Sequence, residues 1–167
     1  MFDPELGAAA RRLLALCRER GLRIATAESC TGGLVIASLT EIAGASDVVD
    51  RGFVTYSNAA KIDMLGVRPA SLEREGAVSE RVAREMAEGA LARARADLAV
   101  AVTGIAGPGG GSPAKPVGLV HFAVARRGAP TRHAEHRFAG DRSAIRLKAV
   151  RTALAMLEEE AGAPLSA

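Results

Sequence analysis

Aromatic residues and lysines are scarce in this sequence. Trp is absent, and Phe, Tyr and Trp together make up 3% of the 167 residues. The core must therefore be built from aliphatic side chains, chiefly Ala, Val, Leu and Ile. Lys61, Lys115 and Lys148 are the only lysines, so the positive charge rests mainly on arginine. The net charge of +3 could favour a phosphorylated ligand, but it is too small to indicate nucleic-acid binding by itself.

Cysteine is scarce too, and long apolar runs are absent. Cys17 and Cys30 form neither a disulfide framework nor a metal-binding spacing, and Cys17 is expected to pack as a small hydrophobe. We therefore expect no metal and no cofactor. No apolar run approaches the length of a membrane span, and the N-terminus lacks a signal-peptide pattern. These absences predict a cytoplasmic protein without a membrane partner.

Helical and strand patterns alternate along the chain. Helices are expected over 4–20, 34–39, 59–65, 79–95 and 141–160, with a loop and short helix over 68–76, and strands over 22–26, 51–57, 97–103, 117–125 and 131–138. This order predicts a single α/β domain over residues 1–167, ordered from about 4 to 160, with a frayed tail from Gly162. The expected fold is a three-layer α/β/α domain with a mixed, mostly parallel sheet and a C-terminal antiparallel hairpin.

The segment 24–33 (IATAESCTGG) reads as a buried strand that ends in a polar turn before an apolar helix. This pattern predicts Ser29, Cys30 and Thr31 at a helix N-terminus, where backbone N–H groups lack intrahelical partners. Such a position suits a nucleophile beside an oxyanion hole, or a phosphate. An equally simple interpretation is a helix N-cap formed by Ser29 or Thr31.

The residues that flank this turn are candidates for substrate binding. Gly32 and Gly33 remove side chains that would keep a ligand away from the backbone. Glu28 could position the turn or accept a hydrogen bond from a substrate amide. It could equally be a carboxylate that stabilises the start of the helix.

A second group of candidates follows the strand expected over 51–57. Tyr56 is expected on that strand, and Lys61 near the start of the next helix, where its ammonium form is disfavoured. A buried Lys61 could accept the proton of Ser29, and the Tyr56 hydroxyl could relay or orient that proton. The plain alternatives are a solvated surface lysine and a half-buried strand tyrosine.

A glycine-rich loop over 103–113 follows the most apolar strand. Its candidate binding residues are Thr103, Gly104, Gly107 and Gly109. Glycine-rich turns supply backbone donors to phosphates, and Arg142 and Arg146 could add guanidinium groups or simply lie on a solvated helix face. If the strands before the three loops 27–33, 56–61 and 103–113 are parallel neighbours, these loops converge at the carboxyl ends of the strands.

Two other nucleophile arrangements stay open. His121, His133 and His136 lie in the C-terminal hairpin, where His121 is expected to be a satisfied sheet residue and the other two to be exposed. No local motif supports a Ser-His-Asp triad. Cys30 could replace Ser29 as the nucleophile, because a helix N-terminus favours a thiolate.

Six motifs occur in order: AESCTGGL, VTYSNAAK, GAVSE, VTGIAGPGGG, KPVG and FAGDRSAIR. Together they resemble the C-terminal domain family of the competence/damage-inducible protein CinA, from about residue 5 to residue 160. Stand-alone members are nicotinamide-nucleotide amidohydrolases, so the resemblance implies hydrolysis of nicotinamide mononucleotide to nicotinate mononucleotide and ammonia. It further implies a dyad of Ser29 and Lys61, a supporting catalytic Tyr56, and a homodimer or larger homo-oligomer.

Two non-enzymatic alternatives remain. The same loops could hold a nucleotide or a partner without turnover. The competence and damage link in the family name, with the basic stretch 126–151, suggests nucleic-acid binding. Only Phe122 and Phe138 could stack on bases there, so binding to single strands is poorly supported.

Overall fold

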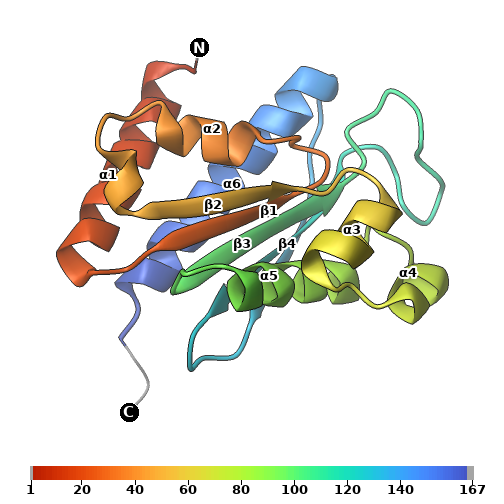
Figure 1. The fold of residues 1–167 in the computed structure, drawn as a ribbon. Helices are drawn as coiled ribbons and strands as arrows, with labels where there is room; N and C mark the ends of the chain where they lie inside the picture. Colours follow the sequence, from red (N-terminus) through yellow and green to blue (C-terminus); the bar gives the residue numbers. More distant parts are fainter. Residues whose placement is uncertain (1, 165–167) are drawn as a thin grey trace.

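The structure is a computed structural model that describes residues 2–164. Within them, one sheet carries helices on both faces (Figure 1). The helices are α1 (Pro4–Arg20), α2 (Leu34–Thr40), α3 (Asn58–Leu65), α4 (Pro69–Glu75), α5 (Glu80–Arg93) and α6 (Arg142–Gly162), with a 3-10 turn η1 (Ala45–Asp47). The strands are β1 (Ile24–Glu28), β2 (Val49–Val54), β3 (Leu98–Gly104), β4 (Leu119–Arg126) and β5 (Arg132–Arg137).

The strands are ordered β2-β1-β3-β4-β5 across the sheet. β1 pairs in parallel with both β2 and β3, whereas β4 is antiparallel to both β3 and β5. Four strands therefore run in one direction and only β4 runs against them, which confirms the predicted mixed, mostly parallel sheet with its C-terminal hairpin. Glu28 pairs with Val54 on one side and Val102 on the other, so the carboxyl ends of three parallel strands meet.

The two faces of the sheet differ in side-chain size. α1, α2 and α6 cover a face of larger aliphatic residues and Phe122, and α3, α4 and α5 lie on the opposite side (Figure 1). That second face carries the alanines Ala25, Ala27, Ala99, Ala101, Ala123 and Ala125. Because side chains alternate between the faces of a strand, this alanine face follows from the sequence pattern, and it lets α5 lie close to the sheet.

A close helix contact fixes the position of α3. A Cβ atom at Gly89 of α5 would lie 1.9 Å from the carbonyl oxygen of Leu65, so only glycine fits at this position. The same carbonyl accepts a hydrogen bond from Arg93 at 2.9 Å. These contacts hold the C-terminal end of α3 against α5, and α3 is the helix that carries Lys61.

The predicted helices agree with the structure within two residues at each end, but two strands shift. β1 begins and ends two residues later than expected, and β2 ends at Val54. Tyr56 therefore lies beyond the strand on which it was predicted, and it is 64% exposed, which excludes the alternative of a half-buried strand tyrosine. The chain leaves the sheet here, and the Thr55 and Tyr56 carbonyls both accept hydrogen bonds from Lys61.

Two other expectations concern the ends of the chain and the membrane. The predicted frayed tail lies partly outside the described residues, which end at Pro164, and α6 itself continues to Gly162. Among the helices described here, none combines the length and the apolar character needed to cross a membrane.

Candidate functional site

A buried carboxylate organises the turn that joins β1 to α2. The Glu28 side chain, which is fully buried, accepts hydrogen bonds from the backbone N–H groups of Gly33, Val35 and Ile36 at 2.9, 3.0 and 2.9 Å. Helix α2 begins at Leu34 as expected, and Ser29, Cys30 and Thr31 lie in the turn before it. Glu28 occupies those donors and acts as the helix-start carboxylate, which leaves it unavailable to a substrate amide.

Replacing Glu28 with glutamine is expected to lower the free energy of unfolding by about 2–3 kcal/mol, because hydrogen bonds to a buried charged group are lost. A glutamine amide offers one acceptor oxygen, and its NH2 group would face backbone donors. Urea unfolding followed by circular dichroism measures the change. Glu41→Gln, at the exposed end of the same helix, is the matched control and should leave the midpoint unchanged; equal midpoints for both variants would contradict this role of Glu28.

Ser29 and Lys61 meet at the carboxyl ends of β1 and β2. The Lys61 Nζ lies 3.0 Å from the Ser29 Oγ, and it donates to the carbonyl oxygens of Thr55 at 2.8 Å and Tyr56 at 3.4 Å. The lysine side chain is almost fully buried, with 1% of the residue exposed, and Ser29 is 9% exposed. The two carbonyls can take the two N–H bonds of a neutral amine, so its lone pair is left for the serine hydroxyl.

Burial shifts the pKa values of two groups in opposite directions. Loss of solvation lowers the pKa of Lys61 to about 8, so about a tenth of the amine is neutral at pH 7 and the neutral fraction rises steeply above it. Burial likewise raises the pKa of the Cys30 thiol to about 11. The alternative of a thiolate nucleophile at Cys30 is therefore not supported, because the thiol is buried in the turn.

A cavity of about 190 Å³ opens beside Ser29 and Lys61. It is lined by Ser29, Cys30, Tyr56, Asn58, Lys61, Ala77, Val78, Thr103, Gly104, Ala106 and Arg142. The three loops predicted to converge do so, because β2, β1 and β3 are parallel neighbours. Seven of the predicted site residues line the cavity, and they come from all three loops and from the start of α6.

Seven other predicted residues lie outside the lining. Glu28, Thr31, Gly32 and Gly33 belong to the turn, Gly107 and Gly109 to the glycine-rich loop, and Arg146 to α6. Thr31 is fully buried, and the N–H of Gly33 is held by Glu28. The predicted contact of these residues with a ligand is therefore not supported by the cavity.

Four lining residues were missed by the sequence analysis: Asn58, Ala77, Val78 and Ala106. Each lies inside one of the quoted motifs. Asn58 follows the N-cap Ser57 and looked like a capping residue. The others are alanine and valine, which carry no chemical group that marks a site. Thr103 holds Ala77 in place, because the Thr103 hydroxyl donates to the Ala77 carbonyl at 2.9 Å.

The two candidate arginines have different surroundings. Arg142 lines the cavity, is exposed, and donates to the Gly107 carbonyl at 2.8 Å and the Tyr56 hydroxyl at 3.1 Å. Arg146 is half-buried and donates to the carbonyls of Cys30 and Thr31 at 3.1 and 2.9 Å. Neither is the freely solvated helix residue of the alternative interpretation. The Tyr56 hydroxyl contacts Arg142 and not Ser29 or Lys61, so the geometry does not favour the predicted proton relay.

The histidines form a separate cluster. His121 Nδ1 lies 2.9 Å from His133 Nε2, with Glu80 3.5 Å from His133 and Glu135 3.8 Å from His121. His133 is half-buried, so its predicted exposure is wrong, whereas His136 is exposed as expected. No histidine lines the cavity at Ser29. The partner of Ser29 is Lys61, which removes the basis for a Ser-His-Asp triad.

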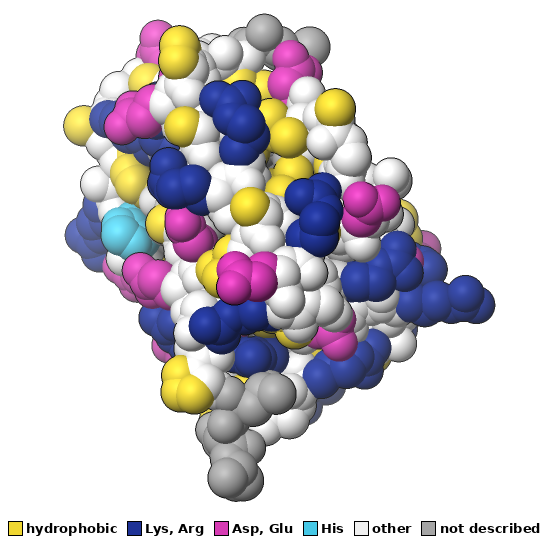
Figure 2. Space-filling view, turned by 90° about the vertical axis from the view of Figure 1, so that its left-hand side faces the viewer, with side chains coloured by type: hydrophobic (Ala, Val, Ile, Leu, Met, Phe, Trp, Pro, Cys, Tyr) yellow, Lys and Arg dark blue, Asp and Glu magenta, His cyan; other side chains and the backbone are white. Residues whose placement is uncertain are grey.

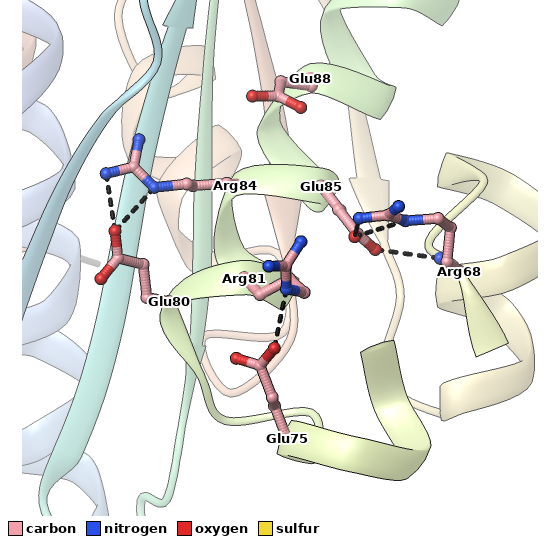
Figure 3. A pocket seen from close by; sticks show the side chains of 7 residues that line it. All are labelled: Arg68, Glu75, Glu80, Arg81, Arg84, Glu85 and Glu88. Atoms are coloured by element: carbon pink, nitrogen blue, oxygen red, sulfur yellow. Dashed lines mark hydrogen bonds and ion pairs between the residues drawn. The ribbon is translucent and has the colours of Figure 1, made fainter. Parts of the chain in front are cut away.

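A larger hollow lies on the surface of α4 and α5. It has a volume of about 420 Å³ and is lined by Arg68, Glu75, Glu80, Arg81, Arg84, Glu85 and Glu88 (Figure 3). Arg68, Arg81 and Arg84 form ion pairs with Glu85, Glu75 and Glu80 at 2.6 to 2.7 Å. Because these charges satisfy each other, the hollow offers a ligand little that is unpaired, and the smaller cavity at Ser29 is the better candidate site.

Several arginines of the basic stretch 126–151 are paired with acidic side chains. Arg132 pairs with Glu159 and Glu160, and Arg151 with Asp3 and Glu5. On the face shown in Figure 2, Lys and Arg side chains are interspersed with Asp and Glu. This face therefore lacks the continuous positive surface that nucleic acid requires. Within residues 2–164, no group of three or more His, Cys, Asp or Glu side chains has the arrangement of a metal site.

Comparison with known proteins gives a consistent result. Residues 7–161 match the model of the CinA C-terminal domain. The nicotinamide-nucleotide amidohydrolase PncC of Enterobacter agglomerans is 54% identical over 135 residues, which are 81% of this chain and 82% of that protein. The protein of the same name from Escherichia coli K12 is 49% identical over 160 residues, which are 96% and 97% of the two chains.

A solved structure agrees with the fold. The competence/damage inducible protein CihA from Agrobacterium tumefaciens superposes with a TM-score of 0.92 at 57% identity, covering 94% of this chain and 96% of that one. The chain therefore belongs to the CinA C-terminal domain family.

Proposed function

We propose that the protein is a nicotinamide-nucleotide amidohydrolase that converts nicotinamide mononucleotide to nicotinate mononucleotide and ammonia. The hydrolase class is supported by the names of relatives that align with this chain over most of their length. The observation that carries the proposal is the 3.0 Å contact between Ser29 and a lysine that is buried and has a lowered pKa. A serine beside a neutral amine is an activated nucleophile for an amide carbonyl.

Lys61 starts the reaction as a general base. Its neutral amine accepts the proton of the Ser29 hydroxyl while the serine oxygen attacks the carbonyl carbon of the substrate carboxamide. The Thr55 and Tyr56 carbonyls hold the amine, so its lone pair is directed at Ser29 and not at solvent. The resulting ammonium stays in place as the acid for the next step.

Backbone donors of the turn can stabilise the oxyanion. The N–H groups of Cys30 and Thr31 donate to no oxygen within residues 2–164. The Ser29 N–H, in contrast, donates to the Val102 carbonyl at 2.9 Å. Cys30 directly follows the nucleophile and lines the cavity. The N–H of the residue after the nucleophile serves this purpose in other serine hydrolases, and we assign the same role to Cys30.

The tetrahedral intermediate then breaks down to an acyl-enzyme, and water hydrolyses the acyl-enzyme in a second step. The Lys61 ammonium gives its proton to the amide nitrogen, the C–N bond breaks, and ammonia leaves with the nicotinate acyl group attached to the Ser29 oxygen. Neutral Lys61 next takes a proton from water, whose oxygen attacks the acyl carbon. The Ser29 oxygen regains that proton from Lys61, and the product carboxylate is released.

Size and charge suggest how the nucleotide lies. The cavity of about 190 Å³ is smaller than most ligand pockets, which hold roughly 300–1,000 Å³, so it suits the pyridine carboxamide alone. The ribose and phosphate then extend past the mouth, where Arg142 and Tyr56 are exposed and bonded to each other. Arg142 keeps donors free for a phosphate oxygen, because only two of its N–H bonds are used by protein groups.

Arg142→Met is expected to raise KM for nicotinamide mononucleotide by about tenfold or more, because a charge-assisted bond to the phosphate is lost. The variant should change KM for nicotinamide riboside, which lacks the phosphate, by less than about twofold. Steady-state assays of both substrates measure the difference. An equal rise in KM for the two substrates would show that Arg142 does not bind the phosphate.

Ammonia release from nicotinamide mononucleotide by the purified protein tests the proposed function. We expect stoichiometric formation of ammonia and nicotinate mononucleotide by the wild-type protein, without added metal. Binding of the nucleotide without turnover would support a non-catalytic binding module instead and would overturn the proposal.

A further inference from the structure

We infer that Arg146 is a positioning residue, which holds the turn after β1 so that the backbone N–H of Cys30 meets the oxyanion. The inference rests on the proposed function. It assigns to Arg146 a role different from the phosphate contact expected from the sequence. Arg146 lies on α6, far from the turn in sequence, and its guanidinium contacts the turn directly.

Within residues 2–164, the hydrogen bonds of the Arg146 side chain all go to the turn. Its Nε donates to the Cys30 carbonyl at 3.1 Å, and one terminal nitrogen donates to the Thr31 carbonyl at 2.9 Å. A Cβ atom built at Gly32 would lie 3.4 Å from that nitrogen, so the guanidinium also packs closely beside the turn. Arg146 does not line the cavity, in contrast to Arg142 one helical turn earlier.

Because peptide groups are planar, these hydrogen bonds also restrain the direction of a neighbouring backbone N–H group. The hydrogen bond to the Cys30 carbonyl fixes the peptide plane that follows the Cys30 Cα, and so limits the rotation of this residue and the direction of its N–H. The Cys30 N–H donates to no oxygen within residues 2–164, and Cys30 lines the cavity, whereas the buried Thr31 does not. The positive guanidinium beside the turn also favours negative charge that develops there.

The turn is held from both ends by opposite charges. Glu28 binds the N–H groups at the start of α2, and Arg146 binds the carbonyls before it. The guanidinium lies near enough to Cys30 to oppose the rise in the pKa of its thiol that burial causes. Rigid donors aimed at a developing charge act on the transition state more than on the bound substrate.

Arg146→Met is therefore expected to lower kcat by about a hundredfold, the usual loss for one oxyanion donor, with KM for nicotinamide mononucleotide changed less than about threefold. Arg146→Lys should recover part of kcat, because an ammonium can bind one carbonyl. Added guanidinium chloride at millimolar concentration should raise kcat of the Met variant several-fold and leave the wild-type rate unchanged. Arg151→Met, on the same helix but paired with Asp3 and Glu5, is the matched control and should keep wild-type kcat.

Each contrary outcome has a distinct meaning. A folded Arg146→Met variant with wild-type kcat would overturn the inference. So would a loss of kcat that follows the loss of folded protein in a thermal melt and is not recovered by lysine or by guanidinium. A tenfold rise in KM with unchanged kcat would indicate that Arg146 binds the phosphate, as expected from the sequence, and would overturn the inference. If the wild-type protein released no ammonia, the proposed function itself would fail and the inference with it.

Discussion

Replacing Ser29 with alanine is expected to abolish ammonia release, with kcat reduced by about a thousandfold or more, because the variant lacks the atom that forms the acyl-enzyme. The fold should be retained, since Ser29 lies in a turn and its backbone N–H keeps its bond to the Val102 carbonyl. Residual activity should come only from binding and from the oxyanion donors. Initial rates with nicotinamide mononucleotide measure the loss.

Two variants make the Ser29 result specific. Ser38→Ala removes another buried serine hydroxyl, which donates to the Val35 carbonyl at 2.7 Å, and should keep wild-type kcat. Cys30→Ala should also keep most activity, because the Cys30 thiol has a pKa of about 11 and stays protonated. Activity that survives in Ser29→Ala and is lost in Cys30→Ala would reverse the assignment of the nucleophile.

Lys61→Met is expected to reduce kcat by about a thousandfold, within the range that general acid–base catalysis contributes. Methionine fills a similar volume and keeps the buried position apolar, so the variant tests the amine and not the packing. The base is the neutral amine, whose pKa is about 8. Wild-type kcat/KM should therefore be low in acid, rise as the pH passes through about 8, and level off above it.

The matched control for Lys61→Met is the same substitution at Lys148, a lysine on the protein surface. Lys148 donates to the Ala139 carbonyl at 2.6 Å on the exposed side of α6, and Lys148→Met should leave both kcat and the pH profile unchanged. A Lys61→Met variant with kcat within tenfold of wild type would contradict the role of the amine as base. A wild-type profile that falls as the pH rises through 8 would contradict it as well.

Much of the fold could be predicted because local signals and tertiary packing agree. Asp3, Ser57, Ser79 and Asp141 cap the helices that the sequence pattern predicts, and Gly21 ends the first one. The apolar strand β3 lies at the centre of the sheet as expected. The convergence of the three loops could also be predicted. Loops at the carboxyl ends of neighbouring parallel strands lie together, and β2, β1 and β3 are such neighbours.

The partners of individual side chains could not be predicted in the same way. Nothing local tells that Glu28 binds three N–H groups of α2, or that Arg146 binds two carbonyls more than a hundred residues away. Tyr56 looked like a strand residue because β-propensity continues past the last ladder pair. The sequence suggested Lys61 as a catalytic base from its place near the start of a helix, but it does not show that the side chain is buried. The predicted homo-oligomer and cytoplasmic location stay predictions.

The most direct test of the account is to map where a phosphonofluoridate, a reagent for activated serines, attaches to the protein. Peptide mass spectrometry should find the adduct on Ser29, at a labelling rate that rises with pH through about 8 and drops sharply in Lys61→Met. Such a result would establish an activated serine that depends on the lysine. An adduct on Cys30, or a Ser29 adduct formed equally fast without Lys61, would contradict the proposed dyad.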